Sequence, residues 1–201
     1  KIAGELLPGV FHVSARSVAT HALSIFGDHS DVMAARQTGF GFLASGSIQE
    51  IMDIAAVAHL TAIKTRIPFT HFFDGFRNSH EIQKVEALQE DQLAHMVDYE
   101  ALQKYRDSAL SPEHPVTRGT AQNPDIFFQA RESCNKFYEP VADVVDQYMQ
   151  EITKLTGREY HPFTFYGAED AEHVVVAMGS VTQAIKEVVD YGIVGIGLGG
   201  S

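Results

Sequence analysis

One residue of the chain is well placed to bind a small anion. Arg16 follows the apolar residues 10–14 and precedes the small residues 17–20. An apolar run of this kind is typical of a buried strand, so Arg16 should stand at a strand's carboxyl end, where α/β sheets bind ligands. The guanidinium of arginine holds a carboxylate through two parallel hydrogen bonds. Arg16 is therefore a candidate for binding a carboxylate, although the residues alone favour a structural salt bridge.

A second polar group lies in residues 27–31, which read Gly-Asp-His-Ser-Asp. Its two carboxylates and imidazole are of the metal-ligand type, but their spacing matches no familiar ligand pattern and no second cluster lies nearby. We therefore predict that this loop binds no metal. We expect an ordered loop in which Asp28 and Asp31 accept hydrogen bonds from backbone N–H groups and cap a short helix.

A third polar group lies at the end of the apolar residues 67–73 and comprises His71, Asp74, Arg77 and His80. A histidine and an aspartate suggest acid–base catalysis. No serine or cysteine nucleophile accompanies them in a recognisable elbow, however. We favour a structural role, with Asp74 and Ser79 as helix or turn caps and Arg77 in packing or at an interface.

The single cysteine, Cys134, permits no internal disulfide and favours a reducing compartment. One thiol cannot hold an iron–sulfur cluster, which typically needs four. A nucleophilic cysteine needs a positive neighbour that lowers its pKa, and the sequence around Cys134 indicates none. We therefore interpret Cys134 as a free thiol without a catalytic role.

Charge and hydropathy exclude two classes of function. The chain has 15 basic and 26 acidic residues and a net charge of -11, which argues against nonspecific binding to nucleic acid. No apolar run reaches the roughly 20 residues that a membrane helix needs. The predicted location is the cytoplasm or another reducing compartment.

The elements that must position these residues follow an α/β pattern. Residues 39–44 and 67–73 are apolar enough for two further strands, and residues 47–64 have the apolar spacing of a helix between them. Ser47 and Glu50 have the spacing of a capping box. Strand, helix and strand at this spacing predict a βαβ unit.

The rest of the chain is expected to be mainly helical. The predicted helices cover residues 90–110, 125–134 and 141–156, the last one ended by Gly157. A linker over residues 159–170 should lead to a strand over residues 173–178 and a helix over residues 180–191.

Long motifs along the chain resemble the pyruvate:ferredoxin (flavodoxin) oxidoreductases, which depend on thiamine diphosphate. They include Gly-Val-Phe-His-Val-Ser-Ala-Arg (9–16), Ala-Arg-Gln-Thr-Gly-Phe (35–40), His-Phe-Phe-Asp-Gly-Phe-Arg (71–77) and Arg-Gly-Thr-Ala-Gln-Asn-Pro-Asp-Ile (118–126). The motifs are non-repetitive, fall in the family's order and cover residues 1 to about 191.

The resemblance implies an incomplete domain structure. Residues 1–160 would form the C-terminal part of a pyrimidine-type thiamine-diphosphate-binding domain with a parallel sheet. Residues 161–191 would form the first strand and helix of a second α/β domain, like the C-terminal domain of transketolase. Residues 192–201 depart from the family as a glycine-rich tail, which reads as an added tail, a frameshift or a discontinuous piece of the parent chain. We expect strands 10–14 and 67–73 to be unpaired edges, because upstream strands are missing.

The resemblance also implies a function. The family decarboxylates pyruvate on thiamine diphosphate, passes electrons through iron–sulfur clusters to ferredoxin or flavodoxin, and gives the acetyl group to coenzyme A. Arg16 matches the arginine that binds the pyruvate carboxylate, and loop 27–31 would lie close to the cofactor. Magnesium, the cofactor and the clusters would be held elsewhere in the parent polypeptide, a homodimer, so the chain alone should be inactive. The alternatives are another 2-oxoacid as substrate, or a chain that serves only as a structural or interface unit.

Overall fold

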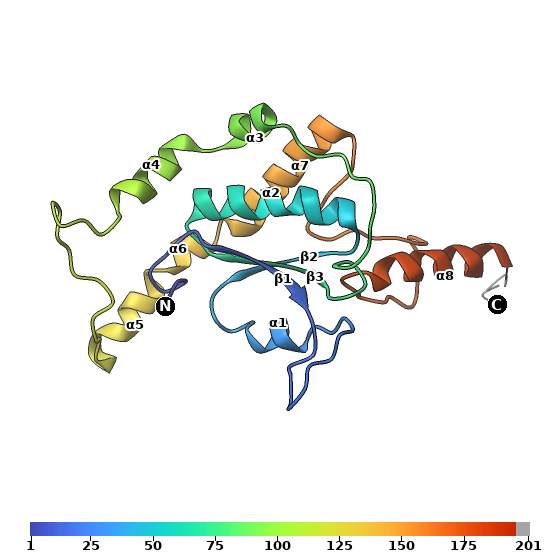
Figure 1. The fold of residues 1–201 in the computed structure, drawn as a ribbon, viewed down its shortest axis with the longest axis horizontal. Coiled ribbons are helices and arrows are strands. Elements are labelled where there is room, and N and C mark those ends of the chain that lie inside the picture. Colours follow the sequence, from blue (N-terminus) through green and yellow to red (C-terminus); the bar gives the residue numbers. More distant parts are fainter. Residues whose placement is uncertain (196–201) are drawn as a thin grey trace.

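A computed structural model describes residues 1–195 of the chain. Its sheet has three parallel strands, which are β1 (Val10–Ala15), β2 (Gly41–Ser45) and β3 (Phe69–Asp74). Helix α2 (Ile48–Thr65) connects β2 to β3 and covers one face, and α1 (Ser30–Ala34) lies against the other (Figure 1). The predicted α/β class and the predicted strand–helix–strand unit are both confirmed.

The strand order is β1-β3-β2, so β3 is the central strand. The prediction that residues 67–73 form an unpaired edge is therefore wrong, whereas β1 does lie at an edge. The reason is that β3 carries buried side chains on both faces: Phe69 packs against α2, and Phe72 packs on the other face against Val32 of α1.

The main core lies between the sheet, α2 and α7 (Val141–Thr156). Phe69 of the sheet, Val57 of α2 and Ile152 of α7 are almost entirely shielded from solvent. Burial of a large apolar side chain contributes about 1.5–3 kcal/mol. The core therefore fixes β3, the strand on which the candidate site is built.

The ends of α2 and α7 test the helix boundaries that were predicted from local sequence patterns. Ser47 caps α2 by accepting the backbone N–H of Glu50 at 3.2 Å. In the predicted capping box the Glu50 carboxylate would accept from Ser47 N. It accepts instead from Gly46 N, at 2.6 Å. Helix α7 ends at Gly157 with φ 74°, as predicted, because glycine adopts this left-handed conformation without steric cost.

The other helices differ from their predicted ranges. Residues 90–110 contain two helices, α3 (Glu90–Met96) and α4 (Tyr99–Asp107), because Val97 is extended and Asp98 caps a new start. Two further short helices are α5 (Pro124–Glu132) and α6 (Asn135–Tyr138). Helix α8 (Val181–Gly195) continues into the segment predicted as a glycine-rich tail. The end of that tail, residues 196–201, lies outside the described residues. None of the described helices is both long and apolar enough to cross a bilayer.

The strand predicted over residues 173–178 is not formed in the structure. Val174, Val175 and Val176 are exposed there, and no neighbouring strand pairs with this segment among the described residues. A strand needs such a neighbour for its backbone hydrogen bonds. The division into two domains stays a prediction.

A polar clamp ties the segment after α7 to α2. Asp53 of α2 has no exposed surface, and both of its carboxylate oxygens accept from Arg158, at 2.7 and 3.2 Å. The Tyr160 hydroxyl donates to the same carboxylate at 2.7 Å. Burial and this hydrogen bond raise the pKa of Tyr160, so its hydroxyl stays protonated and continues to donate.

Three histidines and a serine form a hydrogen-bonded chain on the α2 face of the sheet. His71 Nε2 lies 2.8 Å from Ser45 Oγ, and His71 Nδ1 lies 2.9 Å from Nδ1 of His12, its partner in the β1–β3 register. His12 Nε2 in turn lies 3.0 Å from His59 Nε2 of α2. Burial, together with the charges of His12 and His59, lowers the pKa of His71 from 6.5 to about 4.

This shift predicts a loss of stability in acid. The folded protein keeps His71 neutral, whereas the unfolded chain protonates it near pH 6.5. Stability is therefore complete above pH 6.5 and falls as the pH drops toward 4, by up to roughly 3 kcal/mol at about 1.4 kcal/mol per pKa unit. The urea midpoint of the chain at pH 7 and pH 5 measures this loss, and His71→Asn should make it smaller. An unchanged pH dependence in that variant would show that His71 is not the group responsible.

Candidate functional site at the carboxyl edge of the sheet

Arg16 stands directly after β1, at the carboxyl edge of the sheet, as predicted. Its backbone is held from the following loop: Arg16 N donates to Asp31 Oδ2 at 3.0 Å, and Arg16 pairs with Gly27 in an antiparallel bridge. The second oxygen of Asp31 accepts from Val32 N at 2.6 Å, within the first turn of α1. Asp31 therefore joins the end of β1 to the start of α1.

The side chain of Arg16 lies across Gly75, the residue that follows β3. A Cβ atom added at Gly75 would come within 2.5 Å of Arg16 Cγ and 2.6 Å of Arg16 Nε. Only a glycine leaves room for this approach. Gly75 also donates its N–H to Ala15 O at 2.9 Å, which fixes the two strand ends side by side.

The guanidinium of Arg16 lacks partners among the described residues. Its Nε is buried and has no hydrogen-bond partner there. Arg16 takes part in none of the ion pairs found within residues 1–192. A buried donor without a partner costs about 1–3 kcal/mol, so this arrangement fits an arginine that receives an anionic ligand better than one in a structural salt bridge.

The loop over residues 27–31 uses its carboxylates on backbone N–H groups. Asp28 accepts from Ser30 N at 2.6 Å, and hydrogen bonds from the Ser30 side chain and backbone hold the pKa of Asp28 below its usual range. Asp31 accepts from Arg16 N and Val32 N, as described above. The predicted hydrogen bonds from backbone N–H groups to both aspartates are present, and two of them come from the first turn of α1. The N-cap residue of α1 is His29, however, and its side chain makes no capping bond. Within residues 1–195, no group of three or more histidine, cysteine, aspartate or glutamate side chains is arranged to hold a metal ion.

Asp74, the last residue of β3, joins three segments. One oxygen lies 2.6 Å from Nε2 of His29, and the other accepts from the backbone N–H of Ser180 at 2.8 Å and from the Ser180 hydroxyl. Burial alone would raise the pKa of Asp74, but the hydrogen bonds from Ser180 and His29 together hold it below its usual range. Asp74 is therefore a charged acceptor at neutral pH.

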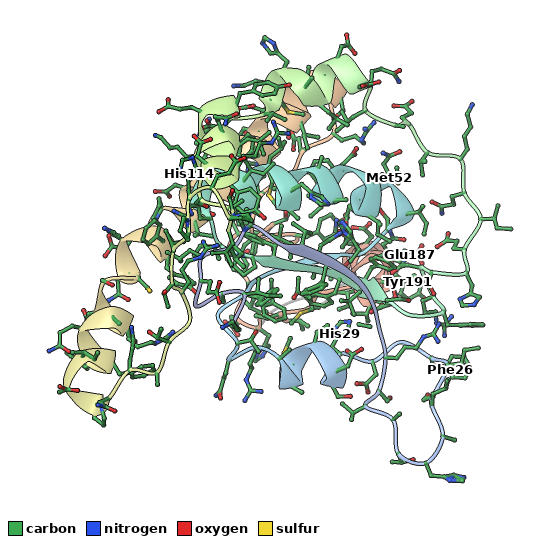
Figure 2. The ribbon with its side chains drawn as sticks, turned by 60° about the vertical axis from the view of Figure 1, so that its left-hand side comes forward. Phe26, His29, Met52, His114, Glu187 and Tyr191 are labelled. Atoms are coloured by element: carbon green, nitrogen blue, oxygen red, sulfur yellow. The ribbon has the colours of Figure 1, made fainter. Side chains whose placement is uncertain are left out.

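His71 and Asp74 do not form a catalytic pair. Along a strand alternate side chains point to opposite faces, so His71 meets His12 and Ser45 on the α2 face. Asp74 meets His29, whose ring packs edge-on against Phe72 on the α1 face with 5.2 Å between the centroids. His29 lies next to α1 (Figure 2). The predicted structural roles are confirmed for Asp74, which caps the turn before α8.

The remaining predicted residues lie outside this arrangement. Ser79 Oγ accepts from Phe76 N at 2.8 Å, a turn-capping role, and His80 Nδ1 lies 3.0 Å from the same hydroxyl on the surface. Arg77 is exposed and lines an open hollow of about 590 Å³ beside the start of α8. The Cys134 thiol donates to a backbone carbonyl one turn earlier at 3.3 Å, the contact of a structural thiol.

The comparison with protein families matches residues 1–150 to the family described as "Pyruvate flavodoxin/ferredoxin oxidoreductase, thiamine diP-bdg". This match covers most of the chain, including every residue of the sheet. The chain belongs to this family. The predicted resemblance is confirmed, and the parallel sheet with its helices is consistent with the family's thiamine-diphosphate-binding domain.

Relatives of the chain carry related names. It is 63% identical over 190 residues to a pyruvate-flavodoxin oxidoreductase of Klebsiella pneumoniae and 59% identical over 191 residues to a pyruvate:ferredoxin oxidoreductase of Moorella thermoacetica. It is also 50% identical over 191 residues to a pyruvate dehydrogenase (NADP+) of Cryptosporidium parvum. These matches cover 94–95% of the chain but only 16%, 16% and 10% of the relatives, so the chain spans a small part of their length.

Several residues of the site were not predicted from the sequence. Gly75 and Ser180 contact the site from segments that are remote from Arg16 in the chain. Outside the site, Asp53 was also missed, although it had a local signal, because it carries a charge directly beside the apolar stripe of α2. His12, likewise outside the site, had a weaker one, as a polar side chain inside an apolar strand.

Proposed function

We propose that the chain is part of an oxidoreductase that decarboxylates pyruvate with thiamine diphosphate, and that Arg16 binds the pyruvate carboxylate. The observation that carries this proposal is the state of Arg16. Its guanidinium stands at the carboxyl edge of a parallel sheet, its Nε is buried without a partner, and no ion pair within residues 1–192 uses its charge. Family membership and the names of the relatives support the reaction.

The role of Arg16 is placement of the substrate. Decarboxylation removes the charge of the carboxylate, so a cation that stabilises this group in the ground state opposes its loss. Arg16 contributes instead by holding the carboxylate in one orientation through a bidentate contact, so that the substrate is already aligned for the reaction. Packing across Gly75 limits the motion of the side chain and so favours this role.

The carboxylates around Arg16 do not fit the magnesium and diphosphate part of the cofactor site. Thiamine diphosphate supplies, when bound, the electron sink on which a 2-oxoacid loses carbon dioxide. Asp31 and Asp74 are both linked to Arg16 through the contacts described above, and every one of their oxygens already has a hydrogen-bond partner among backbone amides, His29 and Ser180. Their hydrogen bonds give them structural roles rather than roles in binding magnesium or the cofactor's ring. The residues that hold the magnesium and the diphosphate therefore belong to other parts of the parent polypeptide.

The same proposal extends to the rest of the reaction. Magnesium and iron–sulfur clusters are cofactors of the parent polypeptide, and coenzyme A and ferredoxin or flavodoxin are its partners. The parent is a homodimer in the cytoplasm, and the chain alone is inactive. This chain supplies the carboxylate-binding arginine and one wall of the active site.

The substrate range of the parent polypeptide tests the proposal. With thiamine diphosphate, coenzyme A and a dye acceptor, kcat/KM should be highest for pyruvate, about tenfold or more above 2-oxobutyrate and 2-oxoglutarate, because a pocket for one methyl group rejects larger side chains. A preference for 2-oxoglutarate would favour a related enzyme for another 2-oxoacid. Oxidation of none of the three, with cofactor bound, would favour a purely structural chain.

A further inference from the structure

The residues around Arg16 form a closed loop of contacts. Asp31 holds the backbone of Arg16, and His29, two residues earlier in the same loop, contacts Asp74. Asp74 is followed by Gly75, across which the Arg16 side chain lies. The network therefore holds the backbone of Arg16 at Asp31 and its side chain at Gly75.

The turn before α8 closes over this network. Gly179 has φ 81°, and a Cβ atom there would lie 2.9 Å from Asp74 Oδ1 and 3.1 Å from the His29 ring. Ser180 then donates both its N–H and its hydroxyl to the second oxygen of Asp74. Both carboxylate oxygens of Asp74 are therefore held, one by His29 and the other by Ser180, from segments about 150 residues apart in the chain.

The loop side of the network is equally close. A Cβ atom at Gly27 would lie 3.1 Å from Asp74 Cβ and 3.1 Å from Gly75 O. Gly27 also pairs with Arg16 in the antiparallel bridge. The backbone of the loop therefore rests directly on Asp74 and Gly75, so that a shift of Asp74 changes the surface on which Arg16 lies.

We propose that Asp74 is a positioning residue for Arg16, which it orients through Gly75, and that His29 and the Gly179–Ser180 turn lock Asp74 in place. This inference rests on the proposed role of Arg16 in binding the substrate carboxylate. It assigns the partly buried charge of Asp74 to substrate alignment rather than to acid–base chemistry. It also makes the docking of the α8 segment a condition for productive binding of the 2-oxoacid.

A double-mutant cycle in the parent polypeptide tests this inference. Asp74→Asn keeps the size of the side chain but places an amide where both oxygens now accept. We expect it to lower kcat/KM for pyruvate by roughly 10- to 100-fold, mainly through KM, while KM for coenzyme A stays unchanged. In an Arg16→Ala background the same change should cost less than about threefold, because no guanidinium remains to be oriented.

Two further variants separate positioning from folding. His29→Ala should act like Asp74→Asn, and His29→Gln, which retains a donor for Asp74, should recover part of the loss. A full additive loss from Asp74→Asn in the Arg16→Ala background, or a fall in Tm with equal losses for pyruvate and coenzyme A, would overturn the positioning role. If Arg16→Ala leaves pyruvate oxidation unchanged, the proposed function of Arg16 is wrong. This result differs from the results that would contradict only the positioning role of Asp74, so the two proposals can fail separately.

Discussion

Arg16→Ala should lower kcat/KM for pyruvate by roughly 30- to 1000-fold in the parent polypeptide, about 2–4 kcal/mol of transition-state stabilisation. The reason is the loss of a charge-assisted bidentate contact from a guanidinium that has no competing ion pair within residues 1–192. Arg16→Lys should recover only part of the activity, since an ammonium is a point charge and lacks the planar fork. Steady-state pyruvate oxidation with a dye acceptor measures both variants.

The matched control is Arg36→Ala. Arg36 is an exposed arginine beyond α1, and among the residues that the structure describes its guanidinium donates only to Met33 O, at 2.7 Å. This variant removes the same charge from the chain and should leave kcat/KM within about twofold of the parent value. Binding of thiamine diphosphate should also be nearly unchanged in Arg16→Ala. If Arg16→Ala weakens the binding of thiamine diphosphate more than it weakens the use of pyruvate, Arg16 supports the fold instead.

The elements that were predicted correctly are those whose signal is local. Val10–Ala15 and Phe69–Asp74 are short apolar runs, and α2 repeats its buried positions with helical spacing. Gly157 ends α7 because one residue decides that geometry. Arg16 could be placed at the carboxyl edge for the same reason, since its position follows from the end of one strand.

The parts that were missed depend on segments distant in the chain. The β1-β3-β2 order depends on which faces α1 and α2 cover, and a single strand's composition does not reveal it. The contact of Arg16 with Gly75 and that of Asp74 with Ser180 join residues 59 and 106 positions apart, respectively. The segment 173–178 has a strand's composition, but it lacks a strand neighbour among the described residues. In each case contacts with segments distant in the chain, or the lack of such contacts, decided the structure, and the local sequence pattern did not specify them.

Asp53 shows how large a consequence such a distant partner can have. Its side chain is 1% exposed and accepts from Arg158 and Tyr160, which lie after α7. Asp53→Ala removes the acceptor and leaves the guanidinium and the hydroxyl without their buried partner. Breaking a buried ion pair from one side costs about 3–5 kcal/mol, so opening of the α2–α7 packing should become roughly 100- to 5000-fold more frequent. Hydrogen exchange of α2 amides in the parent polypeptide measures this opening.

The same arginine provides the control for this prediction. Arg158 also pairs with Glu86 at 2.9 Å, but the Glu86 side chain is 82% exposed. Exposed ion pairs contribute about 0–1 kcal/mol, so Glu86→Ala should speed α2 exchange less than about fivefold although it removes the same charge from the same partner. Equal exchange rates in the two variants would mean that burial of Asp53 adds nothing. In that case the clamp between α2 and the segment after α7 would be a surface contact that does not stabilise the fold.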